Sequence, residues 1–163
     1  MIRIATSQDL NDIMIIVDEI KEEVKITDIL KWDDEYPTRE DFQRDMDKKT
    51  LYITEEEVLK GFMCANKHEH EEFKDVKWSN NDGIIVHRLG IGTKYRNLKR
   101  ALELLEYADE LAIKDGCRYL KTCIYEKNYK SQNLFKKAGY TYVGDISLEE
   151  YEGKFYCYEK FVK

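Results

Sequence analysis

The most regular pattern of apolar and polar positions lies in the second half of the chain, between residues 84 and 112. Residues 84–86 are β-branched, and apolar residues then alternate with Arg88 and Gly90 up to Ile91, which is the period of a strand. Later apolar positions follow helical spacing and line one side of a long helix: Ala101, Leu104, Leu105, Ala108, Leu111 and Ala112. The pattern therefore predicts a strand, a short loop and a helix that begins near Leu98.

Apolar patterning before this unit predicts five further elements. Residues 2–6 alternate as a first strand, and Ser7 is expected to cap a helix with apolar positions from Leu10 to Ile20. A break is expected at residues 32–37, because Pro37 disfavours a helical conformation at the residue before it. Thr38 then suits the N-cap of a short helix, and the β-rich runs 51–54 and 58–65 suit an antiparallel hairpin.

The C-terminal third completes an alternating order of elements. Strands are expected at residues 119–125, 140–146 and 155–162, with a short helix at 128–139 that ends in glycine. A strand, helix and strand in succession across residues 84–125 favour parallel pairing of the two strands. Segment 68–81 has no apolar period and is expected to be an exposed excursion.

Composition narrows the class of protein. The chain has 163 residues, which suits one domain spanning 1–163, and its net charge of −6 argues against nucleic acid as a partner. The four cysteines show no paired spacing and no apolar run approaches the length of a membrane span. We therefore expect a cytoplasmic protein without a membrane partner.

Histidines and acids gather at residues 68–72, which read His-Glu-His-Glu-Glu. Such a run can hold a metal only if distant ligands complete the geometry. The alternative is a solvated loop, and we expect no metal site.

The loop between the central strand and helix carries candidate chemistry. A helix N-terminus presents unpaired backbone N–H groups and the positive end of the helix dipole, which suits a phosphate. Three cations, Arg96, Lys99 and Arg100, fall within five residues. The positive end of the helix dipole repels cations at this position. A bound anion therefore accounts for the three cations better than a helix start that only faces solvent.

Two motifs resemble one family. Residues 89–101, from Leu-Gly-Ile-Gly to Arg-Ala, resemble the acetyl-coenzyme A loop of the GNAT superfamily of N-acetyltransferases, written Arg or Gln-x-x-Gly-x-Gly or Ala. Arg96 and Ala101 match the ends of that motif, whereas Lys99 replaces the central glycine and Asn97 a second usual glycine. Residues 128–140 resemble the family's Asn-x-x-Ala-x-x-Leu-Tyr-x-x-x-Gly-Phe, with Phe135 in place of the tyrosine.

The resemblance implies a mixed α+β GNAT fold with a mostly antiparallel central sheet flanked by helices. It implies acetyl-CoA as cosubstrate without a metal, an amine of a small molecule or peptide as acceptor, and a homodimer as one possible assembly. Pantetheine would lie between two splayed central strands, and the position of Phe135 carries in many members a tyrosine proposed to protonate the departing thiolate. The implied cofactor-binding residues are Leu89, Gly90, Ile91, Arg96, Asn97, Leu98, Lys99, Arg100, Ala101, Asn128, Ser131 and Phe135.

Acetyl transfer needs a neutral amine, so a base is useful. His87 is the candidate catalytic residue, because strand alternation would place it on the same face as Leu89; the alternative is a structural histidine. Trp32 and Tyr36, at the break between the first two helices, are candidates for the substrate wall, with core packing as the alternative.

Two rival interpretations stay open at the level of sequence. One is a degenerate GNAT-fold protein that binds or senses an acyl-CoA or another ligand without catalysis. The other is a structural protein that uses segment 68–81 for contact. Asn97, Lys99 and Phe135, which depart from the family pattern, keep both open.

Overall fold

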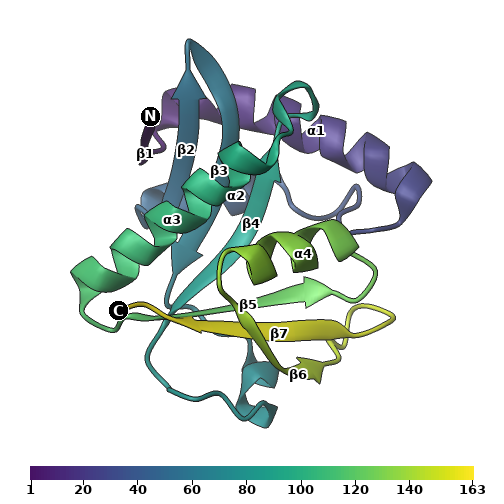
Figure 1. Ribbon diagram of the computed structural model, residues 1–163. Coiled ribbons are helices and arrows are strands. Elements are labelled where there is room, and N and C mark those ends of the chain that lie inside the picture. Colours follow the sequence, from purple (N-terminus) through teal and green to yellow (C-terminus); the bar gives the residue numbers. More distant parts are fainter.

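The computed structural model describes the backbone of residues 1–163 and every side chain except that of Leu98. Its strands form one sheet in the order β1-β2-β3-β4-β5-β7-β6, shown in Figure 1. All neighbouring strands are antiparallel except β4 and β5. The strands are β1 (Ile2–Ile4), β2 (Leu51–Glu56), β3 (Val58–Asn66), β4 (Ile84–Ile91), β5 (Tyr119–Tyr125), β6 (Thr141–Ile146) and β7 (Phe155–Phe161). The helices are α1 (Leu10–Thr27), α2 (Arg39–Asp47), α3 (Leu98–Asp115) and α4 (Tyr129–Lys137).

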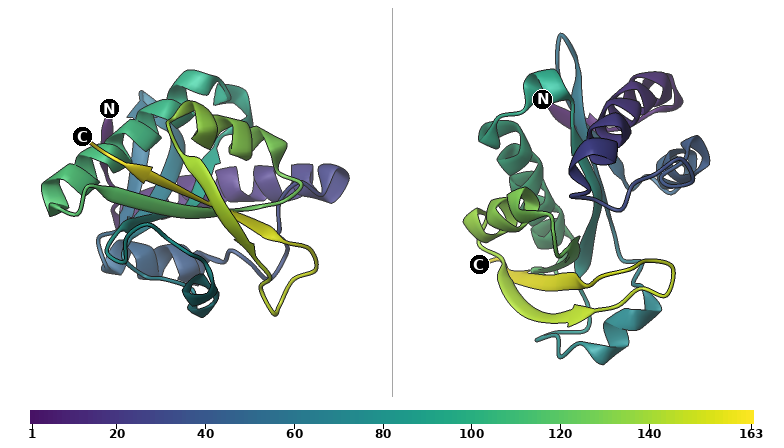
Figure 2. Two further views of the ribbon diagram at one scale, coloured as in Figure 1. Left: turned by 60° about the horizontal axis from the view of Figure 1, so that its bottom comes forward. Right: turned by 90° about the vertical axis from the view of Figure 1, so that its right-hand side faces the viewer.

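Helices cover both faces of this sheet. The right-hand view of Figure 2 shows α3 and α4 on one face and α1 and α2 on the other. On the α1 side, Ile13 and Val17 pack in one cluster with Phe42 of α2. On the α3 side, Leu104 and Phe135 belong to a second cluster. The expected mixed fold and order of elements are confirmed. Among the described residues, no helix has the length and apolar character needed to cross a membrane.

The helix starts show one confirmed and one wrong prediction. Thr38 caps α2, since its hydroxyl accepts the N–H of Asp41 at 3.3 Å and the Asp41 carboxylate accepts the N–H of Thr38 at 2.8 Å. Ser7 does not cap α1. It lies within a 3-10 turn that precedes the helix, and the N–H of Thr6 donates to Asp9 at 2.7 Å. Arg3 holds Asp9 in place with bonds of 2.8 and 2.9 Å.

Segment 68–81 is largely exposed, as its polarity predicts, but two aromatic residues hold it against the sheet. Phe73 is buried, and the indole N–H of Trp78 donates to its carbonyl at 3.0 Å. Ser79 donates to the Glu159 carboxylate of β7 at 2.6 Å. These two aromatic residues pack with Ile85, so the segment folds back against the sheet on the α1 side.

The centre of the sheet is open between β4 and β5. Their only register pairs are Ile84 with Leu120 and Ile85 with Lys121, at the start of each strand. On its other side β4 pairs with β3, where Phe62 lies opposite Gly90 and Cys64 lies opposite His87. Two steps along β3 therefore match three along β4, so the register shifts by one extra residue in β4. The shift is a β-bulge, and it contains Arg88 with a φ of +39°.

Candidate active site

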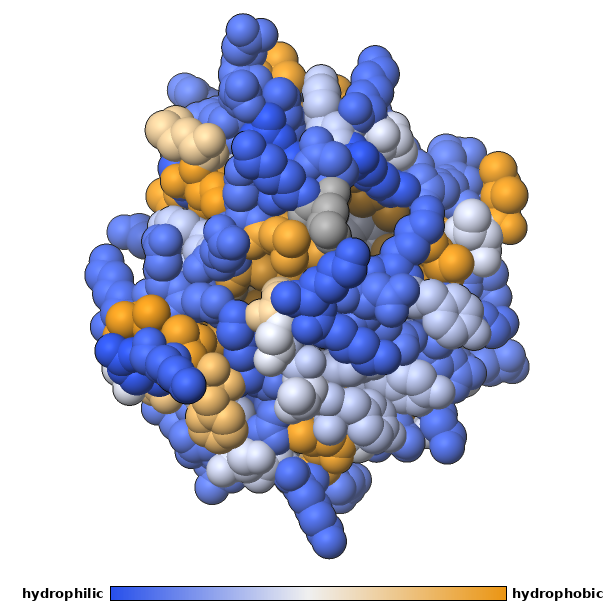
Figure 3. Space-filling model, in the orientation of Figure 1, coloured by the Kyte–Doolittle hydropathy of each residue, from blue (hydrophilic) through white to orange (hydrophobic). Residues whose placement is uncertain are grey.

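A cavity of about 670 Å³ lies where β4 and β5 separate. It is lined from both faces of the sheet, and Figure 3 shows apolar side chains near the centre of the face that carries α3 and α4, with hydrophilic residues beside them. The residues expected from the sequence that line the cavity are Trp32, Tyr36, His87, Leu89, Gly90, Ile91, Arg96, Asn97, Ala101, Asn128, Ser131 and Phe135. The two motifs, separated by some thirty residues, thus border one space.

Two helices begin at the cavity wall. The side chain of Asn97 caps α3 by accepting the N–H of Arg100 at 3.0 Å, and Asn128 caps α4 by accepting the N–H of Ser131 at 3.1 Å. Each cap occupies one of the free N–H groups of its helix and leaves others unpaired in the first turn. The positive ends of both helix dipoles therefore face the same region, which favours an anion there.

Of the three cations of the loop, only Arg96 lines the cavity, and the binding of a phosphate by all three stays a prediction. Arg96 lines the cavity and contacts both carboxylate oxygens of Glu23 at 2.6 Å. Arg100 pairs with Glu56 outside the lining, and the side chain of Lys99 is 83% exposed. Helical spacing turns these two residues away from the cavity: Lys99 faces solvent, whereas Arg100 is mostly covered. The side chain of Leu98 lies outside the described residues.

The bulge also overturns the expected relation between His87 and Leu89. An extra residue in one strand interrupts the alternation of side chains. Leu89 packs with the cluster on the α3 side, whereas His87 is in register with Cys64, which belongs to the cluster on the α1 side. The two side chains therefore line the cavity from opposite faces of the sheet.

His87 is neutral at physiological pH. Burial, together with the positive charge of Arg88, lowers its pKa to about 3. Its Nε2 lies 3.0 Å from Oδ1 of Asn66, and its ring centroid is 6.0 Å from that of His70. A group with this pKa accepts a hydrogen bond at pH 7 but is a weak proton acceptor.

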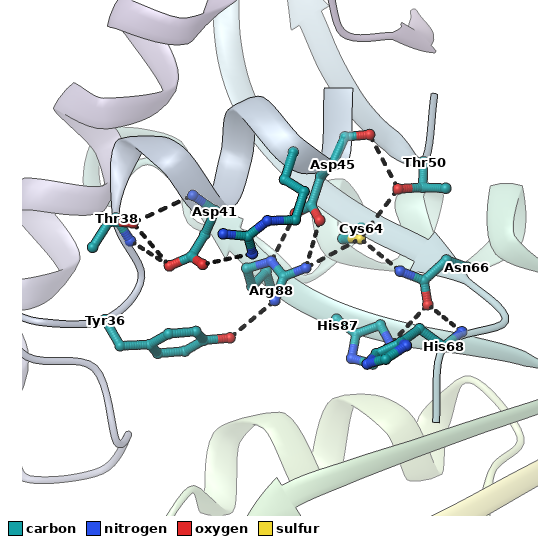
Figure 4. A network of polar contacts seen from close by, with 11 residues as sticks. Tyr36, Thr38, Asp41, Asp45, Thr50, Cys64, Asn66, His68, His87 and Arg88 are labelled. Atoms are coloured by element: carbon teal, nitrogen blue, oxygen red, sulfur yellow. Dashed lines mark hydrogen bonds and ion pairs between the residues drawn. The ribbon is translucent and has the colours of Figure 1, made fainter. Parts of the chain in front are cut away.

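Arg88 joins a buried network that sequence reasoning missed (Figure 4). It donates to the two carboxylate oxygens of Asp45 at 2.8 and 2.7 Å, and to the Tyr36 hydroxyl at 3.0 Å. The network thereby fixes Tyr36 at the cavity wall. One signal was available, because Asp45 lies on the same helical face as Phe42 and Met46, where a lone acid indicates a buried partner.

The α1-side end of the cavity is acidic and aromatic. Glu72, Glu149 and Glu150 line it together with Tyr36 and Tyr151. The positive charge of Arg88 at this end is balanced by Asp45, and the three carboxylates outnumber Lys31, which lines the cavity over the ring of Tyr125. Such a surface attracts a cation from solvent. The three carboxylates come from two loops with no apolar period, so no pattern in the chain indicated that they lie together.

Metal chemistry has no obvious centre in the part of the chain that the structure describes. There, no group of three or more His, Cys, Asp or Glu side chains is arranged to hold an ion. His70, from the run considered as a metal site, instead lines the cavity and packs edge to face on Phe73.

Comparison with known proteins identifies the family. The model of the acetyltransferase (GNAT) family matches residues 17–140. A GNAT-family acetyltransferase from Streptococcus agalactiae is 24% identical with a TM-score of 0.86, covering 100% of this chain and 95% of that one. A candidate acetyltransferase from Staphylococcus aureus Mu50 is 29% identical with a TM-score of 0.77, covering 100% and 99%. A candidate acetyltransferase from Salmonella typhimurium, solved with its cofactor acetyl-CoA, has 14% identity and a TM-score of 0.71, covering 100% and 94%.

A search of the curated proteins found no match. The family model alone spans well over half of the sequence and includes both motifs at the cavity. This chain belongs to the GNAT family of acetyltransferases.

Proposed function

We propose that this protein transfers the acetyl group of acetyl-CoA to an amine of a small molecule or peptide. The observation that carries the proposal is the cavity at the separation of β4 and β5, bordered by the starts of α3 and α4. Its two ends differ in chemistry. The α3 side favours anions and the α1 side favours cations, as a phosphate-bearing donor and an ammonium-bearing acceptor require.

The donor is assigned to the α3 side. Beyond Ile85, β4 pairs with β3 only, so its edge toward β5 leaves backbone groups for the pantetheine arm beside Leu89 and Ile91. Arg96 and the first turn of α3 would hold the pyrophosphate. The fit is supported by an anion already at this place, since the Glu23 carboxylate binds Arg96. The acetyl-CoA complex of the Salmonella neighbour supports the same donor.

The acceptor is assigned to the α1 side. Glu72, Glu149 and Glu150 attract an ammonium group, while Trp32 and Tyr36 form an aromatic wall. A lysine-like amine has a pKa of about 10.4, so roughly one molecule in a few thousand is neutral at pH 7. His87 would accept a hydrogen bond from that neutral amine and orient its lone pair toward the thioester. Its low pKa suits orientation better than storage of a proton.

Departure of the thiolate lacks the usual hydroxyl. Phe135 lines the cavity and packs edge to face on Tyr140, at a centroid distance of 4.9 Å. A positioned acid typically contributes about 10² to 10⁴ in rate. A thiol pKa of about 8.5 makes the unprotonated thiolate a tolerable leaving group, so we propose slow but real turnover.

The second candidate is a ligand-binding GNAT protein without catalysis. It is favoured by Phe135 and by the pairing of Arg96 and Arg100 with glutamates, which reduces the charge available to a phosphate. A measurement of acyl-CoA binding together with a measurement of acetyl transfer separates the two candidates.

Titration calorimetry with acetyl-CoA and with CoA, followed by a thiol-release assay over a panel of amines and peptides, tests the proposal. Binding of acetyl-CoA with thiol release above background for at least one acceptor supports the transferase. Binding without release across the panel supports the ligand-binding protein. No heat and no thermal shift at millimolar acyl-CoA would overturn the transferase and leave only a protein that binds another ligand.

A further inference from the structure

A chain of polar contacts runs from β3 to His87 (Figure 4). Asn66, the last residue of β3, lies at its centre. Its Oδ1 accepts the backbone N–H of His68 at 2.9 Å, and its Nδ2 donates to Sγ of Cys64 at 3.5 Å. Rotating the amide by 180° would place its NH₂ against the His68 N–H, donor against donor. The local backbone therefore fixes which end of the amide faces His87.

The fixed amide determines the tautomer of His87. Its Nε2 lies 3.0 Å from Oδ1 of Asn66, an atom that carries no proton and can only accept. Nε2 must therefore hold the ring proton, since two acceptors at this distance repel. In a neutral imidazole the other nitrogen then has the free lone pair. That nitrogen is Nδ1, and the ring of His87 that carries it lines the cavity.

We propose that Asn66 is a positioning residue that holds His87 as the Nε2–H tautomer, so that Nδ1 accepts the hydrogen bond of the acceptor amine. This inference rests on the proposed function, and it adds how the ring is oriented and which atom takes part. No proton is consumed by the positioning itself. The amine donates one hydrogen bond to Nδ1 and keeps its lone pair for the thioester carbon. As the C–N bond forms, the C–S bond breaks and CoA leaves as the thiolate, which takes up the proton that the amine nitrogen loses.

The surroundings of the ring favour a single proton on it. Burial disfavours a second positive charge most, and the charges of Arg88 in β4 and of His70 and His68 after β3 add to this effect, whereas a contact with the His68 backbone opposes it. From β3 the ring faces Cys64 and Asn66, which are uncharged. The nearby carboxylates Glu72 and Glu150 act on His70, whose pKa burial lowers and their charges raise. His87 is therefore singly protonated across the physiological range, and its tautomer decides which ring nitrogen keeps a lone pair that can accept a hydrogen bond.

Long-range ¹H–¹⁵N spectra of the imidazole groups test the tautomer directly. We expect a pure Nε2–H form for His87 in the wild type and a mixture of both tautomers in Asn66→Leu. Asn66→Asp supplies an acceptor of the same shape, so it should keep the Nε2–H form and, by its charge, raise the pKa of His87. Asn133→Leu is the matched control, because Asn133 is an exposed residue of α4 outside the cavity lining.

Kinetics test whether the tautomer is used. In Asn66→Leu, kcat should fall at least about tenfold, a part of what a positioned acid or base contributes, while acetyl-CoA affinity and Tm stay close to wild type. Asn66→Asp should recover most of the rate and move the acidic limb of the kcat profile to higher pH. A purely structural role for Asn66 would change Tm but neither the tautomer nor this limb.

The outcomes separate failure of this inference from failure of the function. A wild-type His87 in the Nδ1–H form, or an unchanged tautomer in Asn66→Leu, overturns the positioning. A changed tautomer with an unchanged kcat overturns its part in transfer. If the wild type releases no thiol with any acceptor, the proposed function fails, and the spectra still decide how Asn66 holds the ring.

Discussion

Removing the carboxylate of Glu23 should strengthen the binding of acetyl-CoA. Glu23, on α1, contacts Nη1 of Arg96 with both oxygens at 2.6 Å, and both residues line the cavity. A phosphate that binds Arg96 has to replace this carboxylate or share the guanidinium with it. The side chains of Arg96 and Glu23 are 36% and 28% exposed, so solvent screens the ion pair. The free energy needed to give up this pair when a phosphate binds is therefore about 0.5 to 1 kcal/mol. Glu23→Gln should therefore lower the Kd by about two- to fivefold.

Calorimetric titration of acetyl-CoA at low and high salt measures this change. Glu22→Gln is the matched control, because it removes the same charge one residue earlier, from an exposed side chain paired with Lys25. The control should leave the Kd within error. The advantage of Glu23→Gln should shrink as salt screens the competition. Affinity that is unchanged or weaker in Glu23→Gln would refute the reasoning, since it would mean that Glu23 holds Arg96 in the orientation that a phosphate needs.

Three further measurements follow from the structure. Phe135→Tyr should keep acetyl-CoA affinity and raise or leave unchanged the rate of thiol release; a Kd weakened more than about tenfold would contradict this. Asp45→Ala strands the charge of Arg88, whose side chain is 16% exposed, and should cost about 3 to 5 kcal/mol, seen as a Tm lower by roughly 10 °C; an unchanged Tm would contradict it. The hydrogen bond from Arg3 lowers the pKa of Asp9, so the stabilisation of the fold by the Asp9 carboxylate is complete above the unfolded pKa of about 3.9 and is lost as pH falls through the lower folded pKa. In Asp9→Asn the denaturant midpoint should therefore fall less steeply at acidic pH than in the wild type. An unaltered acidic part of this profile would argue against the role of Asp9.

The order of elements was predictable because each element has a period long enough to read. The strand at β4 and the stripe on α3 stand out as β-branched residues followed by helical spacing, and the structure places both as expected. The bulge at Arg88 left no such trace, since a single residue at positive φ other than glycine has no signature in apolar patterning. Its consequence was large, because one extra residue reversed the face of His87 relative to Leu89.

The candidate site was predictable where its residues fall within one motif. Arg96 and Asn97 lie in such a motif and line the cavity. Glu23 was missed because it lies more than seventy residues from Arg96 in the sequence, and only the folded chain brings α1 next to the loop before α3. The sequence could not show that Lys99 is exposed, because a run of cations gives the charge but not the direction of each side chain, and a contact of Lys99 with a phosphate stays a prediction.

The strands form one sheet by their order, but few direct bonds cross the β4–β5 junction, which divides the sheet into two parts. Four strands lie on one side of the β4–β5 junction and three on the other. Two register pairs and one side-chain bond, from Thr122 to the carbonyl of Val86 at 3.0 Å, join them directly. A donor arm lying in the gap would act as a missing strand. Amide hydrogen exchange along the second half of β4 should therefore slow when acyl-CoA binds, because the ligand then completes the ladder at the one place where the fold leaves it unfinished.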